Sequence, residues 1–188
     1  MTTKEDLIYR QVFPLKDGTR VLVRPLTAED KEALLELFLP AQSDDKRFIR
    51  HDVNDPQVVS AWVDELDYDK VFPLVALVGK RIVGNATLHF RTGPARHRAE
   101  IRIFLAKDFR QRGVGTRVLQ GLIDIARKRG LQFLEVEIVS DQSHIIKAFN
   151  NLGFVTKCVF EDFYLFPDGS VRDLHLMVLT LQTHTHDF

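Results

Sequence analysis

This sequence predicts an α+β fold, with helices packed against a sheet of mixed strand direction. One observation is a series of short apolar runs separated by turn signals such as Asp17-Gly18 and Gly79-Lys80, which indicate β-hairpins. Another is the order strand, helix, strand over residues 98–139. A crossover this short joins two parallel strands with a right-handed connection, and a ligand crevice is then expected where the helix begins.

The individual elements follow from periodicity and from capping residues. Apolar runs predict strands at residues 12–15, 20–24, 74–78, 82–90, 98–105, 131–139, 155–165 and 171–181. Apolar residues at helical spacing predict helices at residues 27–40, 55–66, 114–128 and 142–152. Thr27 and Asp30 form a capping-box pattern, Asp55-Pro56 starts a helix, and Gly130 ends one. The uninterrupted apolar run at 131–139 indicates a strand buried on both faces.

The composition fits one domain spanning residues 1–188, with an N-terminal hairpin extension at 1–20 and a tail at 182–188. Lysine plus arginine equals aspartate plus glutamate at 26 each, so no overall basic field would attract nucleic acid or a membrane. Cys158 is the only cysteine, which excludes an internal disulfide. The chain shows no signal-peptide pattern and no stretch of ~20 apolar residues, so we expect a cytoplasmic protein.

The loop at residues 110–116 carries the strongest chemical signal. It joins a predicted strand to a helix N-terminus, where unpaired N–H groups carry partial positive charge. Gly113 and Gly115 are expected to clear the approach of a phosphate, and Arg110, Arg112 and Arg117 add positive charge. A diphosphate is the ligand that this combination favours over a plain strand-to-helix connection.

Two other kinds of phosphate-binding loop fit these residues less well. A Rossmann dinucleotide site would need a third glycine where Val118 stands, although Glu135 falls at about the expected spacing of ~20 residues. A Walker-type loop is excluded, because no Gly-Lys-Ser/Thr follows.

Arg110, Gly113 and Gly115 resemble the acetyl-CoA signature of GNAT N-acetyltransferases, Gln/Arg-x-x-Gly-x-Gly/Ala. Further segments occur in the family's usual order over roughly residues 21–181, among them Ala99-Glu100-Ile101, Gly130-Leu131 and Leu152-Gly153-Phe154. The resemblance implies a central mixed, mostly antiparallel twisted sheet with one parallel βαβ unit and helices on both faces. Residues 13–19 leading into Arg24-Pro25 also resemble the acetyltransferase domain of bacterial protein-lysine acetyltransferases.

The resemblance implies that acetyl-CoA is the cosubstrate. Its acetyl group would move to a primary amine, in a small molecule or a protein lysine, by direct attack in a ternary complex. The residues expected at the cofactor are Ile103, Phe104, Leu105, Arg110, Gln111, Arg112, Gly113, Val114, Gly115, Thr116, Gln142 and Phe149. A homodimer is compatible with the sequence, and no spacing of histidines with Cys158 indicates a metal.

A general base is needed, because an alkylammonium with a pKa near ~10.4 must lose a proton before it attacks. Glu100 is the first candidate, since related protein acetyltransferases carry a glutamate in an Ala-Glu pair on this strand; alternation puts Arg102 on the same face. Glu137 and Glu135, on the neighbouring strand, are the alternatives. A surface ion pair is the simpler interpretation of Glu100.

The leaving thiolate lacks the family's usual proton donor. Many GNAT enzymes have a tyrosine where Phe149 stands here, and an asparagine where Gln142 stands. Water or Ser143 could protonate the thiolate. Phe149 therefore also allows a second function, a non-catalytic acyl-CoA-binding sensor.

The remaining polar and aromatic residues point to less specific roles. Cys158 and the group Phe160, Phe163, Tyr164 and Phe166 are expected to be packing residues, and His144 to be exposed. The resemblance implies an acceptor site between residues 41–54 and 163–173. The carboxylates available there are Asp44, Asp45, Glu161, Asp162 and Asp168, with His51 nearby.

Overall fold

The computed structural model describes residues 2–41, 49 and 52–181 of the 188-residue chain. Its contacts divide the chain into two compact units. The first holds the residues up to His89 together with Arg102–Leu122, and the second holds Phe90–Ile101 together with the residues from Ile123 onward. Strand β5 (Arg98–Leu105) and helix α5 (Val114–Lys128) each contribute to both units.

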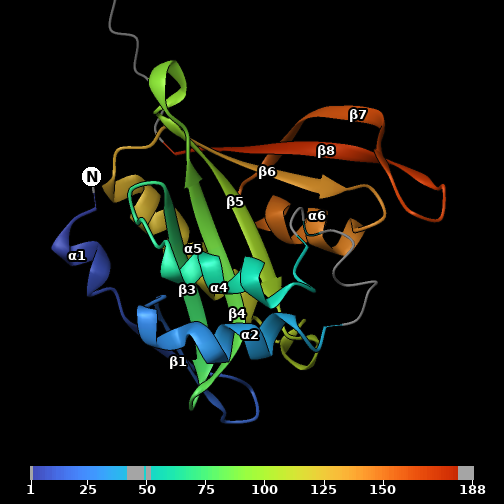
Figure 1. Cartoon of the computed structure of the whole chain (residues 1–188). Coiled ribbons are helices and arrows are strands. Elements are labelled where there is room, and N and C mark those ends of the chain that lie inside the picture. The colour runs from blue at the N-terminus through green and yellow to red at the C-terminus, as the bar shows by residue number, and fades with distance from the viewer. Residues whose placement is uncertain (1, 42–48, 50–51, 182–188) are drawn as a thin grey trace, which may run out of the picture. The chain divides into compact units, whose positions relative to one another are not determined.

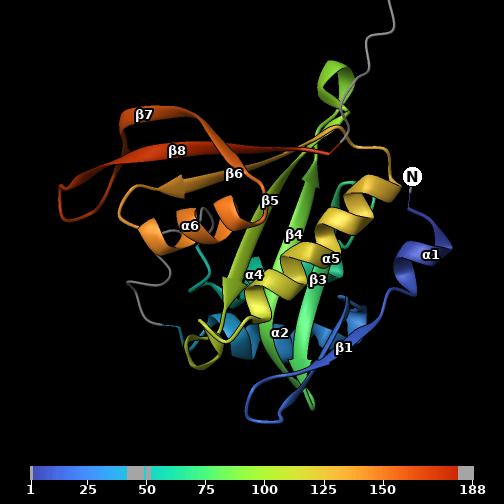
Figure 2. The ribbon, with the colours of Figure 1, turned by 180° about the vertical axis from the view of Figure 1, so that it is seen from behind.

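The first unit is built on antiparallel strands. Strands β1 (Gln11–Pro14), β2 (Arg20–Pro25), β3 (Val71–Val78) and β4 (Arg81–Phe90) pair in that order, and β5 follows β4. Helices α2 (Lys31–Phe38) and α4 (Pro56–Asp64) cover one face of β3 and β4 (Figure 1). The first half of α5 covers the opposite face (Figure 2). This arrangement confirms helices on both faces of the sheet.

Local chemistry explains where the helices of the first unit begin. The Asp30 carboxylate accepts hydrogen bonds from the backbone N–H and the hydroxyl of Thr27, at 2.8 and 2.9 Å, as the capping-box pattern predicts. A 3₁₀ turn (Ala28–Asp30) follows and leads into α2. The Asp55 carboxylate accepts from the N–H of Gln57 at 2.8 Å, and Pro56 occupies the first turn of α4.

The second unit contains the parallel pair. Strand β5 pairs in parallel with β6 (Phe133–Val139), which pairs antiparallel with β8 (Val171–Thr180). Strand β8 pairs antiparallel with β7 (Val155–Leu165), so β7 is the outermost strand. Helix α6 (Ser143–Asn151) lies between β6 and β7 in the chain, and Gly130 ends α5 with φ +71°. The mostly antiparallel sheet with one parallel pair confirms the predicted fold class.

Two predictions about burial were wrong, and one short helix was not predicted. Strand β6 is not buried on both faces, because half-buried Glu135 and Glu137 alternate with buried Leu134 and Val136. Cys158 is exposed rather than packed in the core, because it lies on the outermost strand. The short helix α1 (Lys4–Leu7) was not predicted, although Thr3 and Asp6 form a capping box at its start.

Aromatic burial also differs from the prediction. Phe166 is buried as expected, whereas Phe160 and Phe163 are largely exposed. In the described ranges, no helix is both long and apolar enough to cross a membrane.

Candidate functional site

The predicted phosphate loop lies in the first unit, between a 3₁₀ turn (Lys107–Phe109) and α5. Gln111 and Gly113 both adopt positive φ, at +56° and +84°, and these turns bring the backbone into the helix start. The N–H of Arg117 donates to the carbonyl of Gly113 at 3.2 Å. Among the described residues, no acceptor faces the N–H groups of the three residues before it, 114–116. Three adjacent donors are thus left at the positive end of a 15-residue helix.

The two glycines of the loop have different roles. A Cβ atom at Gly113 would meet nothing within 4 Å, so the positive φ and an open approach explain glycine there. A Cβ at Gly115 would lie 3.1 Å from Leu105 Cδ1 and 3.6 Å from Ile103 Cδ1. Gly115 therefore serves the close packing of α5 on β5. Contact of either glycine with a phosphate stays a prediction.

The arginines around the loop also differ in their partners. The Nε group of Arg110 donates to the carbonyl of Leu105 at 3.1 Å, and its guanidinium lies 5.8 Å from the ring centre of Phe104. Arg110 thereby ties the loop to the end of β5. Its contact with a ligand stays a prediction.

Arg112 forms an ion pair with Asp17, in the turn between β1 and β2. The hydrogen bond from the N–H of Thr19 lowers the pKa of Asp17, and the Arg112 guanidinium lowers it further. The sequence gives no local signal for this pair, because 95 residues separate its members.

Arg117 differs from Arg112 in its surroundings. Its guanidinium lies 5.5 Å from the ring centre of Phe13, and in the part of the chain that the structure describes it has no ion-pair partner. Arg117 is exposed and follows directly on the three free N–H groups. Free donors, an open Gly113 and an uncompensated cation together suit a diphosphate group, so these residues fit the coenzyme that the resemblance implies.

The candidate bases lie on β5 and β6. Glu100 is only 3% exposed and faces Glu135 directly in the parallel register. Two adjacent carboxylates repel each other unless cations intervene. Arg91 supplies one cation, with a guanidinium nitrogen 3.4 Å from Glu100 Oε2 and 3.6 Å from Glu135 Oε2.

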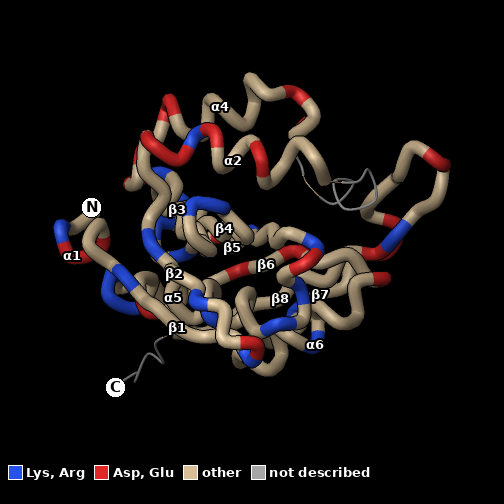
Figure 3. Tube along the Cα trace, turned by 90° about the horizontal axis from the view of Figure 1, so that it is seen from below, with Lys and Arg blue, Asp and Glu red and all other residues tan. Residues whose placement is uncertain are grey.

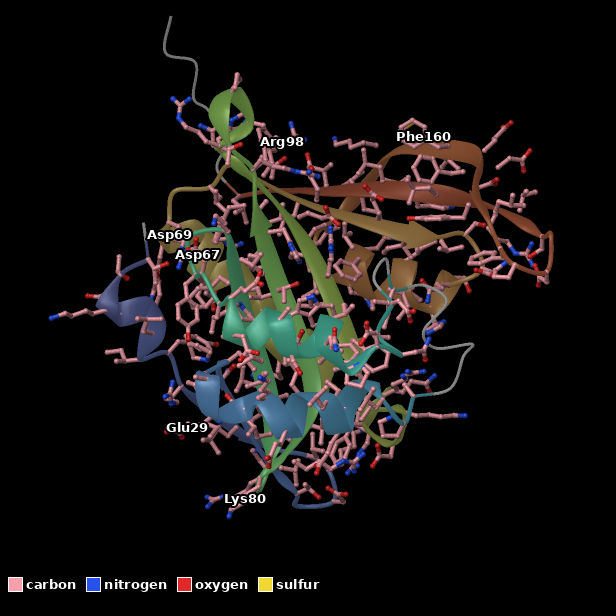
Figure 4. All side chains as sticks on the ribbon, viewed as in Figure 1. Glu29, Asp67, Asp69, Lys80, Arg98 and Phe160 are labelled. Carbon is pink, nitrogen blue, oxygen red and sulfur yellow. The ribbon has the colours of Figure 1, made fainter. Side chains whose placement is uncertain are left out.

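Arg98, which is labelled in Figure 4, supplies the second cation, because it pairs with Glu135. The result is a charge-balanced cluster of two carboxylates and two guanidiniums. Glu100 was expected to form a surface ion pair with an arginine. The structure instead shows a buried Glu100 carboxylate beside Arg91, which lies in the connection before β5.

Glu137 stands apart from that cluster. Acidic residues run along β6 (Figure 3), and Glu137 is the second of them, half-buried. Its Oε2 atom accepts a hydrogen bond from the Tyr164 hydroxyl at 3.4 Å. The sequence predicts only packing for Tyr164, because a contact between residues 27 positions apart leaves no local signal.

Helix α6 holds the last two predicted cofactor residues. Gln142 precedes the helix, and its carbonyl accepts from the N–H groups of Ile145 and Ile146. Phe149 is 2% exposed and packs edge-on against Phe154 with ring centres 5.0 Å apart. Its core role is confirmed, whereas contact of either residue with the coenzyme stays a prediction.

The residues expected near the acceptor fall into two groups. Asp44, Asp45 and His51 lie outside the described residues. Glu161, Asp162 and Asp168 are exposed on β7 and the turn after it, and Ser143 and His144 are exposed on α6. Within the described ranges, no group of three or more residues is arranged to hold a metal ion.

Comparison with known proteins places these features in a family. Residues 32–154 match the model of the acetyltransferase (GNAT) family. An uncharacterized N-acetyltransferase of Methanocaldococcus jannaschii is 28% identical over 139 residues, which cover 72% of this chain and 61% of that protein.

Solved structures share the fold at lower identity. The GNAT domain of S. lividans PAT has a TM-score of 0.75 at 21% identity, covering 96% of this chain and 99% of that one. A putative acetyltransferase from Salmonella typhimurium, solved with acetyl-CoA, gives 0.75 at 21% identity, with 88% and 96% covered. The ribosomal-protein-S5-alanine acetyltransferase of Vibrio fischeri gives 0.76 at 15% identity, with 92% and 97% covered. With its family model matched over most of its length, the chain belongs to the acetyltransferase (GNAT) family.

Proposed function

We propose that this protein transfers an acetyl group from acetyl-CoA to a primary amine by direct attack in a ternary complex. The observation that carries the proposal is the helix start at α5, where three free N–H groups adjoin the uncompensated Arg117. These groups would hold the diphosphate of the coenzyme. Membership in the acetyltransferase family supports this donor, as does the bound acetyl-CoA in the Salmonella protein.

We favour Glu137 over Glu100 as the base. A base must reach the acceptor amine and exchange its proton, and Glu100 is buried beside Arg91. Glu137 is half-buried and hydrogen-bonded to a hydroxyl. Glu137 would take the proton of the attacking amine as the C–N bond forms. The C–S bond would then break as the tetrahedral intermediate collapses.

The departing sulfur needs no dedicated acid in this scheme. Phe149 cannot donate a proton, and its burial makes it a packing residue. A thiol with a pKa near ~8.5 can leave largely as thiolate. Backbone N–H groups near Ile103–Leu105 would stabilise the oxyanion of the tetrahedral intermediate.

The kind of amine that accepts the acetyl group is suggested only by the names of structurally similar proteins. Several structures of the same fold are named ribosomal-protein-alanine acetyltransferases, and another belongs to S. lividans PAT. These names favour a protein amine over a small free amine. Protein amines and small free amines are therefore both included in the experiment below.

A coenzyme-binding sensor is the second candidate function. Buried Phe149 at the usual tyrosine position and buried, ion-paired Glu100 favour it. A sensor would bind acetyl-CoA tightly without transferring the acetyl group to any acceptor.

One experiment separates these functions. Binding of acetyl-CoA and NAD is measured by calorimetry, and thiol release is then followed with small amines, lysine peptides and peptides with a free N-terminus. We expect acetyl-CoA binding and acceptor-dependent thiol release. Tight binding with no turnover on the whole panel would favour the sensor, and binding of NAD alone would overturn both.

A further inference from the structure

The hairpin of β7 and β8 is unusually apolar on its surface. The large hydrophobic residues with substantial exposure in the described chain number ten, and six of them lie on this hairpin. They are Val155, Val159, Phe160, Phe163, Leu165 and Val171. Clusters of exposed apolar side chains often mark surfaces that bind another protein.

The same hairpin provides an open strand edge. Strand β7 is 11 residues long and pairs with β8 on one side only, so its other side carries backbone groups without a neighbouring strand. Exposed edges of this length invite pairing with another chain. Phe160 on β7 is labelled in Figure 4.

The regular part of β7 is centred on Val159. Register with β8 is interrupted between Thr156 and Cys158, and again between Phe160 and Tyr164. Between these bulges, three consecutive residues, 158–160, pair regularly with β8. Pairing with a further strand would therefore be centred at or near Val159.

The residues on either side of Val159 are self-complementary. If two β7 strands pair antiparallel about a two-fold axis at Val159, Cys158 of one chain faces Phe160 of the other. Just beyond this regular segment, the axis brings Lys157 of one chain to the side of Glu161 of the other. Counted along the chain, Val155 then corresponds to Phe163, so the same axis relates apolar positions on the two chains. Shifting the axis to Cys158 or Phe160 would instead place Lys157 against Val159 or Phe163.

Lys157 and Glu161 are also available for such a pairing. Both are exposed, and across the described part of the chain neither has an ion-pair partner. Opposite charges facing each other on paired strands stabilise the pairing, and like charges destabilise it.

We propose that β7 pairs with β7 of a second copy, giving a two-fold symmetric dimer with the axis at Val159. The interface is isologous, so each Lys157–Glu161 contact occurs twice. Charge complementarity identifies a second copy, rather than an unrelated partner, as the occupant of this edge.

A cysteine placed on the axis tests the register directly. In a Cys158→Ser background, Val159→Cys puts two thiols opposite each other, with Cα atoms about 4.5–5.5 Å apart, which suits a disulfide. Val155→Cys in the same background is the matched control, because that exposed position corresponds to Phe163 of the partner. We expect oxidation to give a covalent dimer from Val159→Cys and monomer from Val155→Cys. Equal cross-linking of the two variants, or none, would overturn the register.

Charge exchange tests the interface in the unmodified strand. Sedimentation velocity should show a dimer for the wild type, with affinity weakened about tenfold or more by Lys157→Glu or Glu161→Lys. The double variant restores opposite charges and should recover most of the affinity. A monomeric wild type, or a double variant no better than the single ones, would contradict the proposal. Far-UV circular dichroism of each variant separates loss of pairing from loss of folding.

Discussion

The carboxylate of Asp17 is paired with the guanidinium of Arg112, which joins the N-terminal hairpin to the loop that opens α5. Arg112 also lies over the ring of Phe109, 4.8 Å from its centre. The pair places a negative charge beside Arg112, two residues before the first of the N–H donors that would bind the coenzyme. Arg112 therefore adds less attraction for phosphate than its position in the loop suggests.

Replacing Asp17 should strengthen coenzyme binding. Asp17→Asn removes a charge that repels phosphates and releases Arg112 to meet them. We expect the Kd of acetyl-CoA to fall about 3- to 10-fold at low salt, with the gain shrinking as salt screens the charges. Free coenzyme A should gain equally, because Asp17 acts on the phosphates and not on the acetyl group.

Calorimetric titration at two ionic strengths measures both ligands. Asp64→Asn is the control, since it breaks the exposed Lys31–Asp64 pair of the same unit without touching the loop. Weaker binding by Asp17→Asn would mean that Asp17 orients Arg112 instead of competing for it.

Arg117 should matter more than Arg112 for coenzyme affinity. Arg117→Ala removes an uncompensated cation, and we expect the Kd of acetyl-CoA to rise about 5- to 20-fold. Arg112→Ala removes a cation whose charge is already paired with Asp17, so it should raise the Kd of acetyl-CoA less. The same titration, run on both variants, ranks them; the reverse order would place the phosphates nearer Arg112.

An acidic side chain at Gly113 should block the coenzyme. Gly113→Asp sets a carboxylate next to the three N–H donors, so the Kd should rise at least about 100-fold. Gly130→Asp is a matched control, because Gly130 also has positive φ and open space around a Cβ, but lies at the other end of α5. Thermal unfolding of both variants measures the common backbone strain. Similar Kd values for the two variants would remove the helix start as the coenzyme site.

Local signals predicted most of the fold, and tertiary contacts decided what was missed. The helix at Val114–Lys128 was predicted to the residue, because its apolar spacing and the flanking Gly113 and Gly130 all act within a few positions. The exposure of Cys158 depends on β7 being an edge strand, which only strand order reveals. No short-range pattern indicates that order.

The candidate site divides in the same way. Its backbone donors were predicted from a contiguous loop, because glycines and a helix start are adjacent in sequence. The partners of its side chains were not, since Asp17 with Arg112 and Tyr164 with Glu137 are each brought together by distant segments. Alternation along β5 pointed from Glu100 to Arg102, and it gave no sign of Arg91, which the connection before the strand places beside Glu100.

Two glutamine substitutions should separate structure from catalysis. Glu137→Gln should lower kcat at least about 100-fold, because the proposed proton acceptor is lost. It should change the free energy of unfolding less than Glu100→Gln does, because Glu137 is only half-buried whereas Glu100 is buried. Glu100→Gln should instead lower the free energy of unfolding by about 1–3 kcal/mol, because Arg91 loses a charged partner. Steady-state kinetics against pH and urea unfolding measure both. A kcat loss confined to Glu100→Gln would return the role of base to Glu100.

Asp30 should make the first unit sensitive to acid. Burial alone would raise the pKa of Asp30, but hydrogen bonds from Arg24 and Thr27 outweigh it and hold the pKa below its ordinary value. A lowered carboxyl pKa stabilises the folded state above the unfolded value, near ~3.9, and this contribution is lost as pH falls through the folded pKa. Asp30→Asn should therefore cost about 2–4 kcal/mol at pH 7 and progressively less below about pH 4.

Urea unfolding of wild type and Asp30→Asn across this pH range measures the difference. The exposed pair of Arg81 with Asp108 serves as control, because Asp108→Asn removes a carboxylate whose pKa is also lowered, chiefly by the hydrogen bond from Arg81, but which solvent screens. A difference between wild type and Asp30→Asn that stays constant from pH 7 to pH 3 would show that the charge of Asp30 is not what stabilises the start of α2.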